Sequence, residues 1–254
     1  RTRSTALASV LGLMLLMPVF GAAAQDDKDD PTGSLLDPGQ LVTTGFSGII
    51  LSDALGVDAS SPTRIDETFL NPDGATLRIL DIGGVPLGGG VTDKRAAEAF
   101  ALSAREIGQV FGIAIDEAIN PKTKLPAPNI YLGASSAYGL HVVVPDREGD
   151  GWPKRVVTGD PEATFMEGLW GSELGGDSGT IWKIDGVTGK PSVFAKLEIN
   201  GLPNSGPGIG NVAYDKVSKL LFASDLETGI IVSFDLDGNV VGTFDHGVEG
   251  RPAE

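Results

Sequence analysis

The sequence predicts an all-β protein built from repeated antiparallel meanders. Residues 219–244 read KLLFASDLETGIIVSFDLDGNVVGTF, in which three short apolar stretches are separated by two polar turns. Ile230, Val232 and Phe234 alternate with their neighbours at the period of a pleated strand with one buried face. Because an isolated meander of this size is marginal in water, it should be one unit of a larger repeated structure.

Composition supports this fold class and excludes one class of partner. The chain has 254 residues with 36 glycines, 16 prolines and 6% aromatic residues, which suits a turn-rich β protein. It carries 34 acidic against 19 basic residues, a net charge of −15. Nucleic acid needs a basic footprint, so it is excluded as a partner. The absence of cysteine means that no disulfide framework holds the fold.

The first 24 residues have the layout of a secretory signal. Arg1 and Arg3 precede the apolar run STALASVLGLMLLMPVF, and small residues follow it up to Ala24. A membrane anchor is the alternative, because the run is close to the lower length for spanning. Cleavage after Ala24 removes two arginines and leaves a net charge of −17. We therefore expect an exported protein, periplasmic or extracellular, with no stable membrane span after cleavage.

Several segments have expected local structures. Residues 25–40 are rich in acids, proline and glycine and predict a flexible acidic linker. Residues 41–51 predict a strand, and residues 68–82 predict a hairpin around the turn at 71–74. Ser103 and Glu106 have the spacing of a helix capping box, which predicts a short helix.

An internal repeat runs through the second half of the chain. GIAIDE (112–117) followed by NIYLGASSAYGLHVV (129–143) is echoed by GNVAYD (210–215) and KLLFASDLETGIIVS (219–233). Ala114 and Ala213 are 99 residues apart, and Ala134 and Ala223 are 89 apart, close to twice a repeat of ~45 residues. Either two units intervene or one unit carries a long insertion at about 145–178.

These repeated stretches resemble the blades of six-bladed β-propellers. The broad group includes NHL repeats, TolB-like propellers and hydrolases of the senescence-marker-protein, paraoxonase and strictosidine-synthase type. The resemblance covers residues 110–245 well and 41–109 loosely. It implies four-stranded antiparallel blades over 41–254 that form an incomplete ring of three or four blades, with Ala114 and Ala213 on inner strands. A β-sandwich is the alternative fold. Since the chain begins at Arg1 and stops just after a strand-and-turn unit, we expect an N-terminal part of a longer protein.

The resemblance also implies a candidate metal site. The hydrolases of this group hold a divalent metal at the ring axis with carboxylate and amide oxygens. The matching positions here are Asn204, Asn211 and Asp225, with Glu117 as a further ligand, and hard oxygen ligands suit Ca²⁺. The alternative is that these side chains only form turn hydrogen bonds.

A second calcium candidate lies in PDREGDGWPK, residues 145–154. Asp146, Glu148 and Asp150 alternate and are followed by a glycine, in the order of a calcium loop, and the carbonyl group of Trp152 would complete the site. Lys154 and Val157 occupy positions where a complete EF-hand needs ligands, so that motif is excluded. The alternative is a solvated acidic turn.

Nucleophilic catalysis has little support in the sequence. There is no cysteine and no Gly-x-Ser-x-Gly motif, and the two histidines are His141, in an apolar stretch, and His246, in a turn. Trp182 lies in a patterned strand and is expected in the core. Two functions remain: an exported non-enzymatic binding or scaffold module for an unknown protein or cell-envelope ligand, or a calcium-dependent hydrolase of lactone- or phosphotriester-like substrates.

Overall fold

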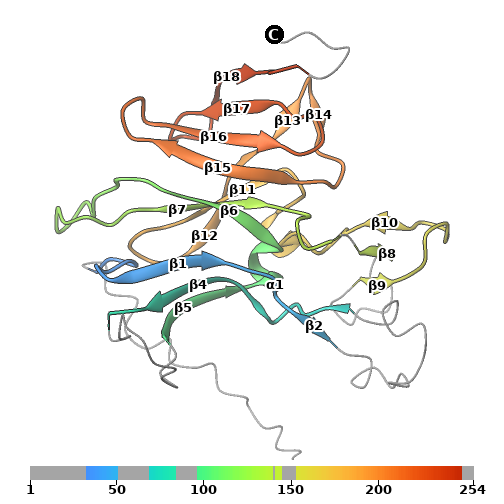
Figure 1. The fold of residues 1–254 in the computed structure, drawn as a ribbon, viewed down its shortest axis with the longest axis horizontal. Helices are drawn as coiled ribbons and strands as arrows, with labels where there is room; N and C mark the ends of the chain where they lie inside the picture. Colours follow the sequence, from blue (N-terminus) through green and yellow to red (C-terminus); the bar gives the residue numbers. More distant parts are fainter. Residues whose placement is uncertain (1–32, 51–68, 84–95, 140, 145–152, 248–254) are drawn as a thin grey trace, which may run out of the picture.

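The computed structural model describes residues 33–50, 69–83, 96–139, 141–144 and 153–247, and almost all of its regular structure is β. Three large antiparallel sheets dominate it (Figure 1). The first sheet has the order β1 (Gln40–Thr44), β4 (Ala75–Asp81), β5 (Ala97–Ser103). The second has the order β6 (Val110–Ile115), β7 (Ile130–Ala134), β11 (Thr180–Ile184), β12 (Pro191–Lys196). The third has the order β15 (Ile209–Asp215), β16 (Leu220–Asp225), β17 (Ile231–Phe234), β18 (Val240–Phe244).

Smaller elements fill the connections. A short sheet has the order β10 (Thr164–Phe165), β8 (Val142–Val144), β9 (Lys154–Arg155). Two-residue strand pairs are formed by β2 (Ile49–Ile50) with β3 (Phe69–Leu70) and by β13 (Glu198–Ile199) with β14 (Leu202–Pro203). The helical turns are α1 (Ala104–Ile107) and the 3-10 helix η2 (Ser172–Leu174).

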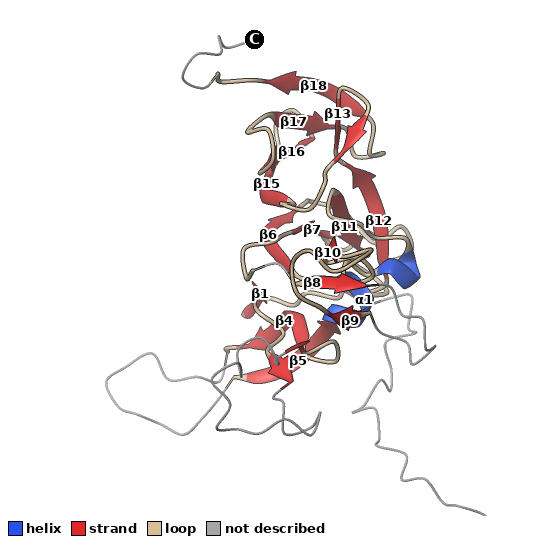
Figure 2. Ribbon diagram, turned by 90° about the vertical axis from the view of Figure 1, so that its right-hand side faces the viewer, coloured by secondary structure: helices blue, strands red, loops and turns tan. Residues whose placement is uncertain are grey.

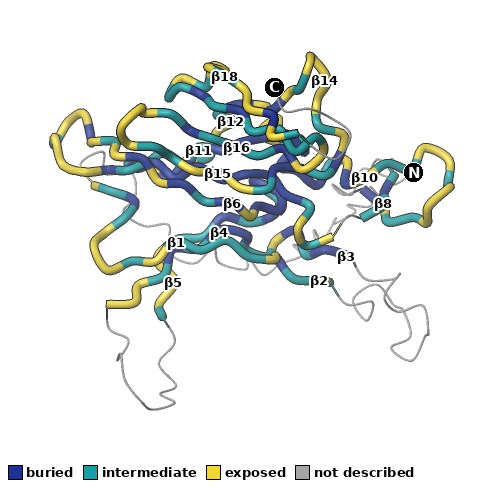
Figure 3. The backbone as a smooth tube through the Cα atoms, turned by 45° about the horizontal axis from the view of Figure 1, so that its top comes forward, coloured by how far each residue is buried: buried dark blue, intermediate teal, exposed yellow. Residues whose placement is uncertain are grey.

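The second sheet lies between the first and the third, and each interface holds its own apolar cluster (Figures 1 and 2). Side chains between the first and second sheets include Leu77, Ile79, Val110, Leu132 and Trp182. Those between the second and third sheets include Tyr131, Ile181, Val212, Leu221 and Phe234. The expectation that Trp182 lies in the core is confirmed, since it is fully buried. Figure 3 shows the buried backbone concentrated along these central strands.

Backbone packs directly on backbone where β6 meets β15. A methyl group on Gly112 of β6 would lie 2.7 Å from the backbone nitrogen of Val212 and 2.8 Å from Cα of Asn211. Such distances are far inside van der Waals contact, so a side chain at position 112 would push the two sheets apart. Contacts farther along, between Glu117 and Lys219, show that β6 and β15 run in the same direction.

The chain is an all-β, incomplete propeller-like arc, as the sequence predicts. β1 pairs with β4, and no strand of the described residues joins β1 to β18. Ala114 and Ala213 lie on the adjacent strands β6 and β15, but only Ala114 is buried. The first sheet departs from the repeat. Thr44 contacts Phe111 and Ser47 contacts Gln109, so β1 runs opposite to β6.

The repeat is interrupted inside the second sheet. The sequence echo places the third strand of this unit within residues 138–143, but the third strand is β11, and β8 pairs instead with β9 and β10. The intervening chain contributes Met166, Leu169 and Trp170 to a cluster with Phe69 and Val143. Val143 of β8 packs in this cluster, which accounts for the apolar alternation around β8. The prediction that this segment is the third strand of the second sheet is wrong.

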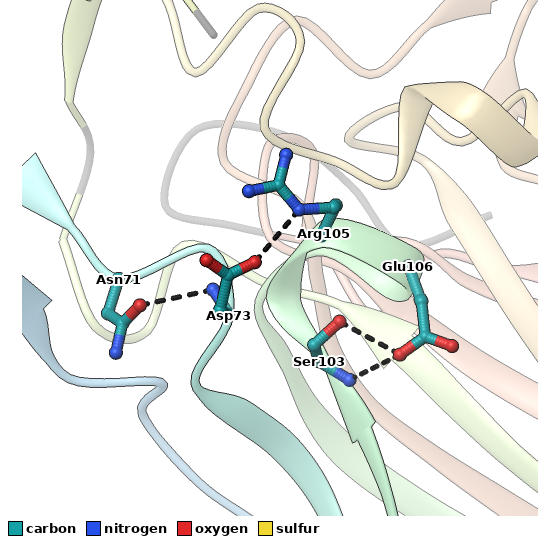
Figure 4. Close-up of polar contacts among 5 residues, drawn as sticks. All are labelled: Asn71, Asp73, Ser103, Arg105 and Glu106. Atoms are coloured by element: carbon teal, nitrogen blue, oxygen red, sulfur yellow. Dashed lines mark hydrogen bonds and ion pairs between the residues drawn. The ribbon is translucent and has the colours of Figure 1, made fainter. Parts of the chain in front are cut away.

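The predicted hairpin at 68–82 is also wrong. β3 pairs with β2 and β4 pairs with β1 and β5, so the turn between them changes sheets. Asn71 Oδ1 accepts a hydrogen bond from Asp73 N, and Asp73 pairs with Arg105 of α1 at 2.9 Å (Figure 4). The predicted capping interaction is present, because Ser103 N and Oγ both donate to Glu106 Oε2 at 2.8 Å (Figure 4).

The described end of the predicted linker, residues 33–40, belongs to the fold. Leu35 is buried against the first and second sheets, and its backbone N–H donates to the carbonyl oxygen of Gly186. Strand β1 then begins at Gln40. The sequence predicts a flexible linker here because residues 25–40 are mostly acidic or turn-forming. Burial of the apolar Leu35 nevertheless packs this part of the segment on the sheets.

Four strand connections use one kind of turn. The side chains of Asn120, Asp185 and Asp215 each accept the backbone N–H groups two and three residues ahead, and Asp225 accepts the one three residues ahead. Thr or Ser stands at the fourth position of each turn. The fifth residue of each turn has a positive φ: Lys124 (61°), Gly189 (71°), Lys219 (59°) and Gly229 (77°). Left-handed backbone costs a side chain roughly 1–2 kcal/mol but costs glycine nothing.

This geometry predicts opposite effects at two matched positions. Lys124→Gly should raise the free energy of unfolding by about 0.5–1 kcal/mol, because Lys124 is exposed and only strain is relieved. Gly229→Ala should lower it by about 1–2 kcal/mol, although the new methyl group meets only ordinary contact with His246. Urea unfolding of both variants measures the pair, and effects of the same sign would contradict the turn assignment.

His141 makes the fold sensitive to acid. Its ring packs edge-on against Phe69 at 5.4 Å, and its buried Nδ1 has no hydrogen-bond partner. Burial, aided by the charge of Arg155, lowers the pKa of His141 to about 4. In the unfolded chain this histidine has the usual pKa of ~6.5. Between that pH and the lower folded pKa, the unfolded chain binds a proton that the folded chain does not bind. His141 should cost stability progressively as pH falls from ~6.5 to about 4 and nothing above this window.

His141→Gln should make stability less dependent on pH in this window. The difference in slope from wild type cannot exceed about 1.4 kcal/mol per pH unit, the value for one proton, and partial solvent contact reduces it. Urea unfolding at several pH values between 7 and 4.5 measures the slope. His246→Gln, which removes the exposed second histidine, is the matched control. Equal slopes for wild type and His141→Gln would refute the role of His141.

Candidate functional site

Asn204 and Asp225, two of the predicted axial ligands, do meet. Asp225 ends β16 and is only 2% exposed, and its Oδ1 accepts a hydrogen bond from Asn204 Nδ2 at 2.6 Å. Its Oδ2 accepts from the backbone N–H and the hydroxyl group of Thr228, at 2.8 and 2.6 Å. A carboxylate offers about four acceptor positions, and three of them are occupied here.

The amide oxygen of Asn204 is fully used by its own loop. It accepts the backbone N–H groups of Gly206 and Gly208 at 3.0 and 2.9 Å. An amide oxygen has two lone pairs, so none is left to bind a cation in this arrangement. The pair therefore fastens the 204–208 loop to the turn that follows β16.

Asn211 and Glu117 have other hydrogen-bond partners. The side-chain oxygen of Asn211 accepts from the backbone N–H of Val212 at 2.9 Å. Glu117 pairs with Lys219 at 2.6 Å beside the β15–β16 turn, and this bond lowers the pKa of Glu117 and raises the pKa of Lys219. Asp225 lies opposite Ile209, the first residue of β15, whereas Lys219 lies in the turn after the last residue of β15. About 20 Å of strand therefore separates the carboxylates of Asp225 and Glu117. They do not converge on one point.

A buried carboxylate at the end of β6 also has a structural role. Asp116 accepts four hydrogen bonds: from the backbone N–H groups of Ala118 and Asn129, from Asn129 Nδ2 and from the hydroxyl group of Tyr131. Burial, followed by the charge of Asp116, raises the pKa of Tyr131. Asn129 Oδ1 accepts in turn from the backbone N–H of Gly186. The network ties β6, β7 and the β11–β12 turn together.

The second calcium candidate lies outside the described residues. Asp146, Glu148, Asp150 and Trp152 all fall within 145–152, so their arrangement remains a prediction. Within the described part of the chain, no group of three or more histidine, aspartate or glutamate side chains has an arrangement that could hold a metal ion.

An exposed aromatic cluster forms where the first two sheets meet. Phe46 stacks on Tyr138 with ring centroids 5.7 Å apart, and Phe111 meets Tyr138 edge-on at 6.2 Å. Phe46 and Phe111 are 40% and 49% exposed, so their rings are held in place and still reach solvent. Thr44 Oγ1 donates a hydrogen bond to the carbonyl oxygen of Phe111 at 2.7 Å, which links the segment before Phe46 to β6. We call Phe46, Phe111 and Tyr138 the aromatic cluster.

Sequence reasoning missed this cluster because its members come from three distant segments. Phe46 lies in GFSG, inside the predicted strand 41–51, and Tyr138 lies in SAYG, inside the echoed repeat, but the structure has both residues in connections outside the strands. An aromatic side chain next to glycines in a turn has no strand face on which to be buried. This context could have indicated that Phe46 and Tyr138 are exposed.

Two hollows are lined by described residues. The larger, about 580 Å³, is lined mainly by apolar and proline side chains of residues 33–38 and 125–128. Its volume lies in the usual range for small-molecule sites. The smaller, about 170 Å³, lies between the β13–β14 pair and the Asn204–Asp225 pair. Ile199 and Leu202 line one side of it and Glu227 the other, where Glu227 accepts hydrogen bonds from Ser205 N and Oγ.

No helix within the described ranges is both long enough and apolar enough to cross a bilayer. The predicted signal at 1–24 lies outside these ranges.

Comparison with known proteins leaves the description at the level of the fold. Neither a protein-family model, nor a curated protein, nor a solved structure matches this chain.

Proposed function

We propose that this chain is an exported, non-enzymatic binding module that presents loop surfaces to a protein or cell-envelope ligand outside the cytoplasm. The aromatic cluster is the observation that carries the proposal. Aromatic residues that are half exposed yet fixed by neighbours supply contact area at a low cost in conformational entropy, and they are enriched in binding sites.

The polar groups of the described residues support a module rather than an enzyme. The oxygens of Asn204, Asp116 and most of Asp225 are occupied by internal hydrogen bonds. A catalytic carboxylate or metal ligand needs a free lone pair directed at the substrate or ion. The export part of the proposal rests on the signal-like residues 1–24 and the acidic, cysteine-free composition.

A binding measurement tests the proposal. The purified chain should co-sediment with isolated cell envelopes of its source organism, and the double variant Phe46→Ala/Phe111→Ala should weaken this binding by about tenfold or more. Both residues are surface-exposed, so the variant should fold. Leu202→Ala/Val217→Ala removes two apolar side chains that are still more exposed and lie away from the aromatic cluster, and it is the matched control.

Two results would contradict the proposal. Equal loss of binding in the test and control variants would mean that the aromatic cluster is not the binding surface. Hydrolysis of a lactone or an aryl phosphotriester that requires millimolar Ca²⁺ and is lost in Asp225→Ala would establish the calcium-dependent hydrolase instead.

A further inference from the structure

The hairpin formed by β13 and β14 carries the one Asn-Gly pair of the sequence, Asn200–Gly201 (Figure 1). These two residues are the whole loop, because Ile199 pairs directly with Leu202. Their φ values are 54° and 75°, the left-handed backbone that a type I′ turn requires at both central positions. Both residues are exposed. The turn therefore places a glycine nitrogen next to an asparagine amide group at the surface.

Asn200 differs from the other asparagines of the chain in its amide group. The chain has seven asparagines, and the side-chain amide groups of the other six are held by hydrogen bonds to described residues: Asn71, Asn120, Asn129, Asn204, Asn211 and Asn239. The amide group of Asn200 has no such bond within the described part of the chain. It is therefore free to rotate toward the backbone nitrogen of Gly201.

The residue that follows each asparagine limits what its amide group can do. The backbone nitrogen of that residue can attack the asparagine Cγ, and a side chain on the same residue hinders the approach. Asn200 is the one asparagine followed by glycine, whereas the others are followed by proline, isoleucine, valine or serine. Proline has no N–H proton to lose, and glycine has no side chain in the way. Attack at Asn200 is therefore the least hindered in the chain.

The hairpin can open at little cost. It has two residue pairs, Glu198 with Pro203 and Ile199 with Leu202, and Pro203 has no N–H group to donate. Leu202 is 71% exposed, and only Ile199 of that pair packs on the core. Hairpins this short are marginal in water. Brief local opening gives the Asn200 side chain and the Gly201 nitrogen the freedom to meet.

We propose that Asn200 is a site of spontaneous deamidation through a cyclic succinimide. The nitrogen of Gly201 loses its proton and forms a bond to Cγ of Asn200, while the bond from Cγ to Nδ2 breaks and Nδ2 leaves as ammonia. Water from the solvent then adds to either ring carbonyl group, and the bond between that carbon and the ring nitrogen breaks. The products at position 200 are aspartate and isoaspartate, in which the backbone runs through the former side chain.

Deamidation changes the smaller of the two hollows. Asn200 lines this hollow together with Asp225 and Glu227, so either product adds a negative charge beside two carboxylates. Isoaspartate also adds a methylene group to the backbone, and the two-residue loop then no longer matches the geometry that joins β13 to β14. The hairpin should therefore open in the isoaspartate form, and Ile199 should lose its packing on the core.

Incubation of the full chain at mildly alkaline pH, followed by peptide mass mapping, tests the proposal. Asn239 is the internal control, because it is also exposed but precedes Val240 and has its amide group bonded to Asp235 at 2.9 Å. Asn200 should convert faster than Asn239 by about tenfold or more, since Asn239 must first give up its hydrogen bonds. The peptide should yield two products of equal mass, and mildly acidic pH should slow their formation because the attacking nitrogen must lose a proton.

Asn200→Gly is the matched variant, because a Gly-Gly pair also suits a type I′ turn and the amide group is gone. Limited proteolysis within residues 198–203 measures the hairpin. Cleavage should increase with incubation time in wild type and stay constant in Asn200→Gly. Equal conversion rates at Asn200 and Asn239 would overturn the proposal, and so would an equal increase of cleavage in both chains. Conversion of Asn200 only in urea-unfolded chains would also overturn it, since the folded hairpin would then prevent the attack.

Discussion

The stack of sheets depends on how closely β6 and β15 approach each other. Their backbones touch at Gly112, where no side chain fits between the two strands. This contact brings the inner strands of two sheets together and allows Tyr131 and Ile181 to reach Val212, Leu221 and Phe234. Burial of these side chains supplies the main favourable free energy of the interface. A second close approach lies farther out, where the turn between β17 and β18 packs at Gly238 against the backbone carbonyl group of Phe194 in β12. Figure 2 shows the three sheets stacked along the arc.

The polar groups divide between the two ends of the strands. At one end, the carboxylates of Asp215 and Asp185 accept hydrogen bonds from backbone N–H groups of the turns that follow β15 and β11. At the other end, Asn204 and Asp225 lock a loop, and the aromatic cluster reaches solvent. The polar residues that most resemble metal ligands therefore form hydrogen bonds at the ends of strands, and the aromatic cluster is the surface that we propose for a partner.

Much of the fold could be predicted from the sequence, and the reason is local. The period-two alternation in β15–β18, the short helix after Ser103 and the buried Trp182 follow from neighbouring residues alone. The partner of β8 could not be predicted, because its strand-like alternation is satisfied by β9 and β10 from an insertion and not by the repeat. Strand β5 could not be predicted either, because its sequence AEAFALS has a weak β propensity. Its strand conformation depends on pairing with β4, which is distant in sequence.

The candidate site was harder to predict than the fold. Asp225 and Asn204 are hydrogen-bonded to each other, and sequence spacing does not reveal that most of their acceptor positions are already occupied. Glu117 was named as a further ligand, yet it follows β6 at the other end of the strands, beside Lys219. Asp146, Glu148 and Asp150 stay a prediction, since they lie outside the described residues.

The close approach of β6 and β15 is tested most directly by comparing two glycine substitutions in equilibrium unfolding. Gly112→Ala should lower the free energy of unfolding by about 1–3 kcal/mol, because the methyl group overlaps the backbone of Asn211 and Val212. Gly45→Ala, at a glycine with open space around its missing side chain, should change it by less than about 1 kcal/mol. Equal, small effects at both positions would show that the two sheets do not meet backbone to backbone.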